Sequence, residues 1–250
     1  MNKSQQLNKL LSHPSLWQAN QGDSLRPVAS TGFTELDKQL HDGGWPQGRL
    51  SELLIPHDGV GELRLLAPLL KALSQQSGFL VMVNPPFLPY LPALHNLGIT
   101  TDKLLVIREH DRQKMIWATY QALVSRSCSA VLVWLPDQGS FKTELRKLSL
   151  GARHSQCWSF VVRDMQASQL PSPACLRLKL DTCSVDGTNI EILKQPGGWA
   201  GQKLKLDLFP ERWQWTSLAG TYWPTANIQS NQSKVNRPQA VNKVNTEELN

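Results

Sequence analysis

Two glycines, Gly59 and Gly61, lie between an apolar run and a leucine-rich stretch, at the place where a phosphate-binding loop would be expected. Residues 50–55 are typical of a strand buried on both faces, and residues 63–73 carry leucines at helical spacing. A loop between a strand and a helix binds phosphate through backbone N–H groups, a lysine and a Ser or Thr hydroxyl. The order of these segments therefore indicates a nucleotide-binding scaffold.

The residues that would carry the chemistry of such a loop are missing from the sequence. The required pattern is Gly-x-x-x-x-Gly-Lys-Ser/Thr, but Ile55 stands roughly at the first glycine, and Glu62 and Leu63 follow Gly61. A carboxylate repels phosphate, and a leucine cannot bind magnesium. We predict a degenerate loop of Gly59, Gly61 and Glu62 that hydrolyses no ATP and binds no cofactor. The alternatives are a simple glycine turn and a live ATPase with an unusual loop.

Other catalytic patterns do not occur in the sequence. Serine, histidine and acidic residues are present, but without a nucleophile elbow or a paired-carboxylate spacing. The cysteines lack the spacing of a metal site and are expected to be reduced thiols: Cys128, Cys157, Cys175 and Cys183. We therefore predict a protein that is not an enzyme and holds no metal.

The composition is that of an ordinary globular protein. The 250 residues suffice for one α/β domain with tails, and the net charge of +6 permits an acidic partner or nucleic acid without requiring either. Residues 1–16 lack the continuous apolar core of a secretory signal, and the leucine-rich stretch 63–73 is interrupted by Arg64, Pro68 and Lys71. We expect a cytoplasmic protein without a membrane span.

The hydrophobic pattern predicts an α/β fold with two kinds of strand. Expected strands at 50–55, 79–83, 104–107, 130–135 and 158–162 alternate with helices, one of them capped by Asp111, which favours a mostly parallel sheet with helices on both faces. After residue 170, apolar and charged residues alternate over 175–180, 189–194 and 203–208, which predicts antiparallel strands. We expect a folded domain over residues 28–218, a polar segment over 1–27 and a disordered polar tail over 219–250.

Several motifs resemble known families. Ser30-Thr-Gly through Leu36-Asp37, then Gly43-Gly-x-Pro-x-Gly-Arg49 and Glu52, resemble the opening of the RecA core domain. A longer resemblance, over roughly residues 30–215, is to ImuA, the RecA-like accessory protein of bacterial translesion synthesis. It rests on Gly44-Trp-Pro-x-Gly, Leu50-x-Glu-Leu-Leu, Gly61-Glu-Leu-Arg-Leu-Leu66, Pro85-Pro with Pro89-Tyr90, Trp134-Leu-Pro136, Ser172-Pro-Ala174 with Leu176-Arg-Leu178, and Glu191-Ile-Leu-Lys194.

A second resemblance covers a shorter range. Leu65-Leu-Ala-Pro-Leu-Leu70 and Ser74-Gln-Gln-Ser77 are similar to SulA, the SOS inhibitor that caps FtsZ and blocks septation, over about residues 50–165. SulA proteins are shorter and lack the Ser-Thr-Gly segment and the basic strands after residue 175. Those extra segments favour ImuA as the main hypothesis, with a SulA-like division inhibitor as the alternative.

The ImuA resemblance implies a RecA-like core that acts as a non-catalytic adaptor in SOS-induced DNA repair and damage-induced mutagenesis. Its implied partners are an ImuB-like polymerase relative, a specialised replicative-type polymerase subunit, RecA and DNA. We expect candidate DNA contacts at Lys142, Arg146 and Arg163, which follow the fourth and fifth strands, although such cations are usually a solvated face. Aromatic and basic residues near the C-terminus are candidate partner contacts, although strand aromatics are more often buried: Trp199, Arg212, Trp213 and Trp215.

Overall fold

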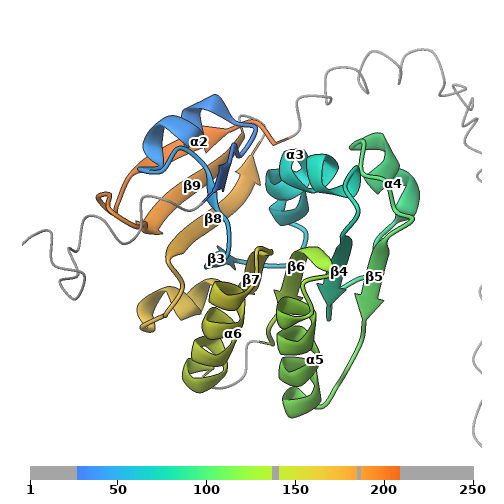
Figure 1. The fold of residues 1–250 in the computed structure, drawn as a ribbon. Coiled ribbons are helices and arrows are strands. Elements are labelled where there is room, and N and C mark those ends of the chain that lie inside the picture. The colour runs from blue at the N-terminus through green and yellow to red at the C-terminus, as the bar shows by residue number, and fades with distance from the viewer. Residues whose placement is uncertain (1–26, 137–140, 185–186, 209–250) are drawn as a thin grey trace, which may run out of the picture. The chain divides into compact units, whose positions relative to one another are not determined.

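The computed structural model describes residues 27–136, 141–184 and 187–208, all within the first of two units of the chain, Met1–Phe209 (Figure 1). The strands are β1 (Val28–Ala29), β2 (Trp45–Pro46), β3 (Leu50–Ile55), β4 (Phe79–Val83), β5 (Leu104–Ile107), β6 (Cys128–Trp134), β7 (Trp158–Asp164), β8 (Leu176–Ser184), β9 (Gly187–Lys194) and β10 (Lys203–Leu206). The helices are α2 (Thr34–Gln39), α3 (Glu62–Ser74), α4 (Leu91–Asn96), α5 (Arg112–Val124), α6 (Lys142–His154) and the 3-10 helix η1 (Met165–Gln169).

Among the described residues, eight strands form one sheet in the order β10-β9-β8-β3-β7-β6-β4-β5. The strands from β8 to β5 pair in parallel, whereas β9 runs antiparallel to both β8 and β10. A separate pair of short strands, β1 and β2, is antiparallel. The prediction of an α/β protein with a mostly parallel sheet and added antiparallel strands is confirmed.

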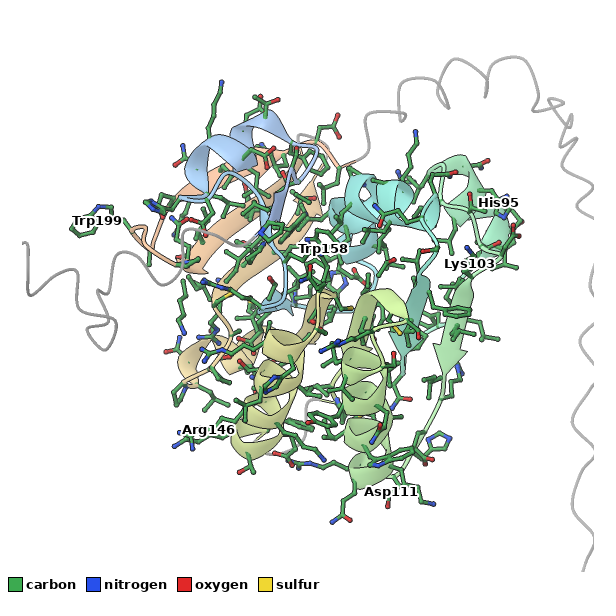
Figure 2. The ribbon with its side chains drawn as sticks, viewed as in Figure 1. His95, Lys103, Asp111, Arg146, Trp158 and Trp199 are labelled. Atoms are coloured by element: carbon green, nitrogen blue, oxygen red, sulfur yellow. The ribbon has the colours of Figure 1, made fainter. Side chains whose placement is uncertain are left out.

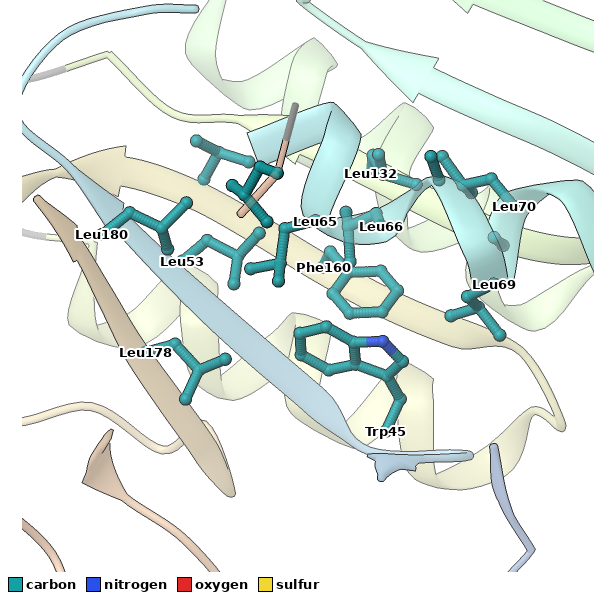
Figure 3. Close-up of a cluster of buried hydrophobic side chains, with 14 of the residues drawn as sticks. Trp45, Leu53, Leu65, Leu66, Leu69, Leu70, Leu132, Phe160, Leu178 and Leu180 are labelled. Atoms are coloured by element: carbon teal, nitrogen blue, oxygen red, sulfur yellow. The ribbon is translucent and has the colours of Figure 1, made fainter. Parts of the chain in front are cut away.

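Helices cover both faces of the sheet (Figure 1). The core on one face joins the sheet to α2, α3 and α4, and there Trp45 meets Phe160 edge to face, with ring centroids 5.2 Å apart (Figure 3). The core on the other face joins the sheet to α5 and α6 through residues such as Ile116 and Leu148. Strand β3 is buried along its whole length because it lies in the middle of the sheet between these two layers.

Local signals account for the helix that begins after Asp111. The side chain of Asp111 accepts a hydrogen bond from the backbone N–H of Lys114 at 2.8 Å, so the predicted cap is confirmed.

No helix in the described part of the chain is long and apolar enough to cross a bilayer. The predicted polar segment, apart from its last residue Pro27, and the predicted tail fall outside the described residues, and the domain boundary at residue 218 stays a prediction.

Candidate functional site

The glycine loop connects the buried end of β3 to the start of α3. Gly59 and Gly61 both have positive φ angles, 79° and 114°, which residues with a side chain rarely adopt. Val60 between them is buried in the core that underlies α3. The loop is therefore fixed on both sides, and its backbone N–H groups turn toward one point at the beginning of α3.

Glu62 occupies that point with its own carboxylate. The N–H of Gly59 donates to Oε1 at 3.3 Å, and the N–H of Gly61 donates to Oε2 at 3.2 Å. Glu62 is only 4% exposed, so the carboxylate is part of the fold. An acid at a helix N-terminus also interacts favourably with the helix dipole. The N–H groups that would bind a phosphate in a working loop thus bind an acid of the same chain.

A second buried acid, Glu52, joins three strands. It lies on β3 and is fully buried, and its Oε1 accepts a hydrogen bond at 2.7 Å from Arg163 on β7. Its Oε2 accepts a hydrogen bond from Nε of Arg177 on β8, whose Nη2 also donates to the carbonyl oxygen of Ala167 at 2.8 Å. The cluster ties the middle of the sheet together on the face that α5 and α6 cover.

The candidate DNA contacts do not form one surface. Arg163 is only 7% exposed and its guanidinium is bound to Glu52, so the structure does not present it to a phosphate. Lys142 and Arg146 are exposed one turn apart on α6. Figure 2 labels Arg146 on this helix. The burial of Arg163 could not be read from the sequence, because only the fold shows that its strand lies beside Glu52.

Of the candidate partner contacts, the structure describes only Trp199. Its side chain is 85% exposed and points away from the sheet at the turn between β9 and β10 (Figure 2). Arg212, Trp213 and Trp215 lie outside the described residues. A contact of Trp199 with a partner stays a prediction.

Sequence reasoning missed an exposed apolar segment between β4 and α4. Phe87, Leu88, Tyr90 and Leu91, named here the α4 surface, are each between 50% and 72% exposed. Pro85 and Pro86 precede this segment and Pro89 lies within it, which keeps the chain out of regular structure up to Tyr90, and Leu91 is the first residue of α4. The signal was the unbroken run of proline, aromatic and leucine residues from Pro85 to Leu91. A cluster of exposed large apolar side chains is typical of a protein-binding surface.

The fold and the loop define a mixed α/β protein in which the N–H groups of Gly59 and Gly61, between β3 and α3, bind the carboxylate of Glu62. The family model described as "Cell division inhibitor SulA" matches residues 48–158, less than half of the chain. This range contains the glycine loop, the α4 surface and all of α5 and α6.

Individual proteins agree with the family match. Two proteins named "Cell division inhibitor SulA", from Yersinia pestis (strain Pestoides F) and Yersinia pseudotuberculosis serotype O:1b (strain IP 31758), are each 27% identical over 139 residues. Each alignment covers 56% of this chain and 82% of the relative. The crystal structure of SulA from Pseudomonas aeruginosa is 25% identical and covers 45% of this chain and 96% of its own, with a TM-score of 0.37, too low to support an argument.

These similarities overturn the hypothesis of an ImuA protein. A RecA-like role in translesion synthesis was wrong, and so were its implied partners: the ImuB-like protein, the polymerase subunit, RecA and DNA. The segments before residue 48 and after residue 175 had favoured ImuA. In the structure, β1 and β2 form a strand pair and β8 pairs with β3, so these segments complete the fold and identify no family.

Proposed function

We propose that this chain is a SulA-like inhibitor of cell division, acting in the SOS response by binding FtsZ. The observation that carries the proposal is the 27% identity that covers 82% of proteins named as cell division inhibitors, together with the family match over residues 48–158. The resemblance of residues 65–77 to SulA points the same way. A location in the cytoplasm follows from this proposal.

The protein acts as a binder and not as an enzyme. The carboxylate of Glu62 already accepts hydrogen bonds from Gly59 and Gly61, so a nucleotide phosphate would have to displace a buried acid and would meet its charge. Isothermal calorimetry with ATP and Mg²⁺ should give a flat trace. Heat of binding that saturates would contradict this part of the proposal. The finer prediction of a RecA-like fold stays a prediction, supported by the position of the loop between β3 and α3.

The α4 surface is the part of the matched range best suited to bind FtsZ. Exposed aromatic and leucine side chains lose the most water on binding and are the usual anchors of a protein interface. Phe87, Leu88 and Tyr90 stand out from the surface without covering a core. Because these side chains contribute little to the fold, their substitution should affect binding and leave stability nearly unchanged.

The experiment combines overexpression with purified proteins. Overexpression in a bacterium should give filamentous cells, and the purified chain should reduce sedimentation of FtsZ polymers. The double variant Phe87→Ser and Leu88→Ser should lose both effects, because an interface anchor is worth about 2 kcal/mol or more. Its thermal midpoint should stay close to that of the parent protein.

The matched control is Trp199→Ser, which also removes an exposed aromatic side chain but lies outside the matched range. It should keep full inhibition. Normal division and unaffected FtsZ polymers with the parent protein would overturn the proposed function. Full inhibition by the Phe87→Ser, Leu88→Ser variant would overturn only the α4 surface as the contact.

A further inference from the structure

Helices α5 and α6 lie side by side on the sheet face opposite to α3 and α4 (Figure 1). They approach closely where Gly151 faces Tyr120, since a Cβ on that glycine would lie 3.1 Å from the tyrosine ring. Toward their N-terminal halves a groove of about 500 Å³ opens between them. It is lined by five residues of α5 and three of α6: Arg112, Gln113, Lys114, Ile116, Trp117, Thr143, Glu144 and Lys147. We name it the α5–α6 groove.

The wall of this groove is apolar and aromatic. Ile116 is buried at its base, and Trp117 beside it leaves 59% of its surface exposed. Nothing in the described fold requires a tryptophan at an exposed position of a helix. An indole beside a concave surface is a typical acceptor for an apolar side chain of a partner.

The charges around the groove are mostly positive. Arg112, Lys114 and Lys147 line it together with one carboxylate, that of Glu144. Nε of Arg112 donates to Oε1 of Glu144 at 2.9 Å, so this acid is held within the protein. Lys114 and Lys147 are exposed, and Nζ of Lys147 lies 5.1 Å from the centroid of the Tyr120 ring.

These cations stand against the helix dipoles. The first turn of α5 contains no acid and carries Arg112 and Lys114, whereas α6 begins with Lys142 but has one acid in its first turn, Glu144, which is paired with Arg112. Acidic residues are favoured at helix N-termini and cations are unfavourable there. Asp111 caps α5 through its side chain and is the one acid that interacts with the dipole at this helix end among the described residues 111–115. The first turn of α5 is thus more positive than its dipole favours, and such a departure from the local preference is expected where it serves an anionic partner.

We propose that the α5–α6 groove binds an acidic polypeptide segment of a partner protein. One apolar side chain of the segment packs against Trp117 and Ile116, and its carboxylates meet Lys114 and Lys147. A peptide fits better than a nucleic acid, because its acids can be placed at the lysines alone and its apolar side chain can pack on Ile116. A nucleic acid carries a negative charge at every nucleotide and could not keep all of its phosphates away from Glu144. This surface lies on the opposite face of the sheet from the α4 surface, so the inference goes beyond the proposed function and does not depend on it.

The test uses the full-length protein labelled with ¹⁵N in its tryptophan indoles. The Trp117 resonance is assigned with the variant Trp117→Phe. The probe is a short synthetic peptide of Glu and Asp with leucines spaced one helical turn apart. Two comparison ligands are the same peptide with Lys in place of each acid, and single-stranded oligothymidylate. The acidic peptide should shift the Trp117 resonance saturably, and neither comparison ligand should do so.

Charge reversal should weaken this binding. The double variant Lys114→Glu and Lys147→Glu should bind the acidic peptide about tenfold or more weakly, since two favourable charge contacts become repulsive. The control is Lys38→Glu with Lys103→Glu, which changes the net charge equally at exposed positions elsewhere and should lose much less affinity. Dispersed spectra of both variants verify that they are folded.

Three results would overturn the proposal. One is the absence of any shift of Trp117 with the acidic peptide. Another is an equal or stronger shift with oligothymidylate, which would make the groove a nucleic-acid surface. The third is an equal loss of affinity in the two double variants, which would show attraction by net charge alone. None of these results bears on inhibition of FtsZ through the α4 surface.

Discussion

At the scale of single residues, two buried glutamates are held by the chain in different ways. The carboxylate of Glu62 accepts hydrogen bonds from backbone N–H groups. Its burial costs little free energy, because N–H groups at the start of a helix need an acceptor. Glu52 binds two guanidinium groups, so one carboxylate is shared by Arg163 and Arg177. Burying charges is costly, and the cluster is tolerated only while every member keeps its partner. Glu52 is therefore the more sensitive position.

Replacing Glu52 with alanine should lower the free energy of unfolding by about 3–5 kcal/mol, because two buried cations lose their counter-charge. Urea denaturation followed by circular dichroism measures the change. The control is Glu191→Ala on β9, where the carboxylate is half-exposed and lies 3.9 Å from both Lys179 and Lys203. That substitution should cost only about 0–1 kcal/mol. Similar losses at the two positions would contradict the structural role of the Glu52 cluster.

The thiol of Cys157 is a second residue whose surroundings decide its chemistry. Burial raises the pKa of this thiol far above its usual value, with a smaller contribution from Cys128 nearby. Because a raised pKa leaves less thiolate at any given pH, and only the thiolate is nucleophilic, alkylation should stay slow as the pH rises through the range where ordinary thiols ionise.

Mass spectrometry of peptides after brief treatment with iodoacetamide measures this protection. Cys157 should react slowly in the native protein and rapidly in urea, and the half-buried Cys128 gives the comparison within the same sample. Rapid native labelling of Cys157 would mean that β7 opens readily or that the thiol is not buried.

At the scale of elements, the segment Ser30-Thr31-Gly32 helps to pack α2 against α3. Ser30 Oγ and the N–H of Thr31 donate to the carboxylate of Asp37 at 2.6 and 2.8 Å, which fixes the segment to α2. Gly32 then passes directly over α3, where an added Cβ would lie 2.4 Å from Cβ of Pro68. The motif therefore joins α2 to α3, and no ligand is needed to explain it.

Substitution of Gly32 by alanine should be more destabilising than the same change at Gly43. Both glycines have positive φ angles, 85° and 77°. The backbone strain of an alanine should therefore be similar at the two positions, about 1 kcal/mol. Only Gly32 would also collide with α3, since nothing lies within 4 Å of a Cβ at Gly43. This collision should lower the free energy of unfolding of the Gly32→Ala variant by about 1–3 kcal/mol more. Equal midpoints of the two variants in urea would show that α2 moves away at little cost.

The elements differ in how well the sequence predicts them. Strands at 50–55, 79–83 and 104–107 were predicted with their observed ends, because each is a short, mostly apolar segment bounded by a proline, a turn or a polar residue. The glycine loop was also located correctly. The α4 surface was missed although the run of proline, aromatic and leucine residues indicated it, whereas the position of the Glu62 carboxylate and the burial of Arg163 were not predictable. Each depends on which segments meet in the fold, and periodicity carries no such information.

At the scale of the whole molecule, the sheet extends beyond the range that resembles SulA. Strand β3 lies between β7 and β8, and β8 with its antiparallel neighbours comes entirely from residues after 175. Leu176, Leu178 and Leu180 of β8 share one core with Leu36 and Trp45 from the segment before residue 48. The parts of the chain outside the match are therefore inseparable from those inside it.

A fragment of residues 48–170 should consequently fail to fold alone, although it keeps β3 to β7 and every helix from α3 to α6. Without β8, strand β3 becomes an apolar edge with unpaired backbone groups. Each buried leucine that is lost or exposed to water reduces the free energy of unfolding by about 1.5–3 kcal/mol. The loss of several leucines therefore exceeds the free energy of unfolding of an ordinary domain, about 5–15 kcal/mol.

Near-ultraviolet circular dichroism and urea titration of the fragment, beside the full chain, test this expectation. The full chain should show a cooperative transition, and the fragment should give a flat near-ultraviolet spectrum and a gradual, non-cooperative change. Cooperative unfolding of the fragment would mean that the SulA-like range is an independent domain. In that case the inhibitory activity should survive in the fragment, and β8 to β10 would be an attachment with a separate role. If instead the fragment is unfolded, inhibition requires the whole sheet, because the α4 surface is held in place only when β4 and β5 belong to a stable core.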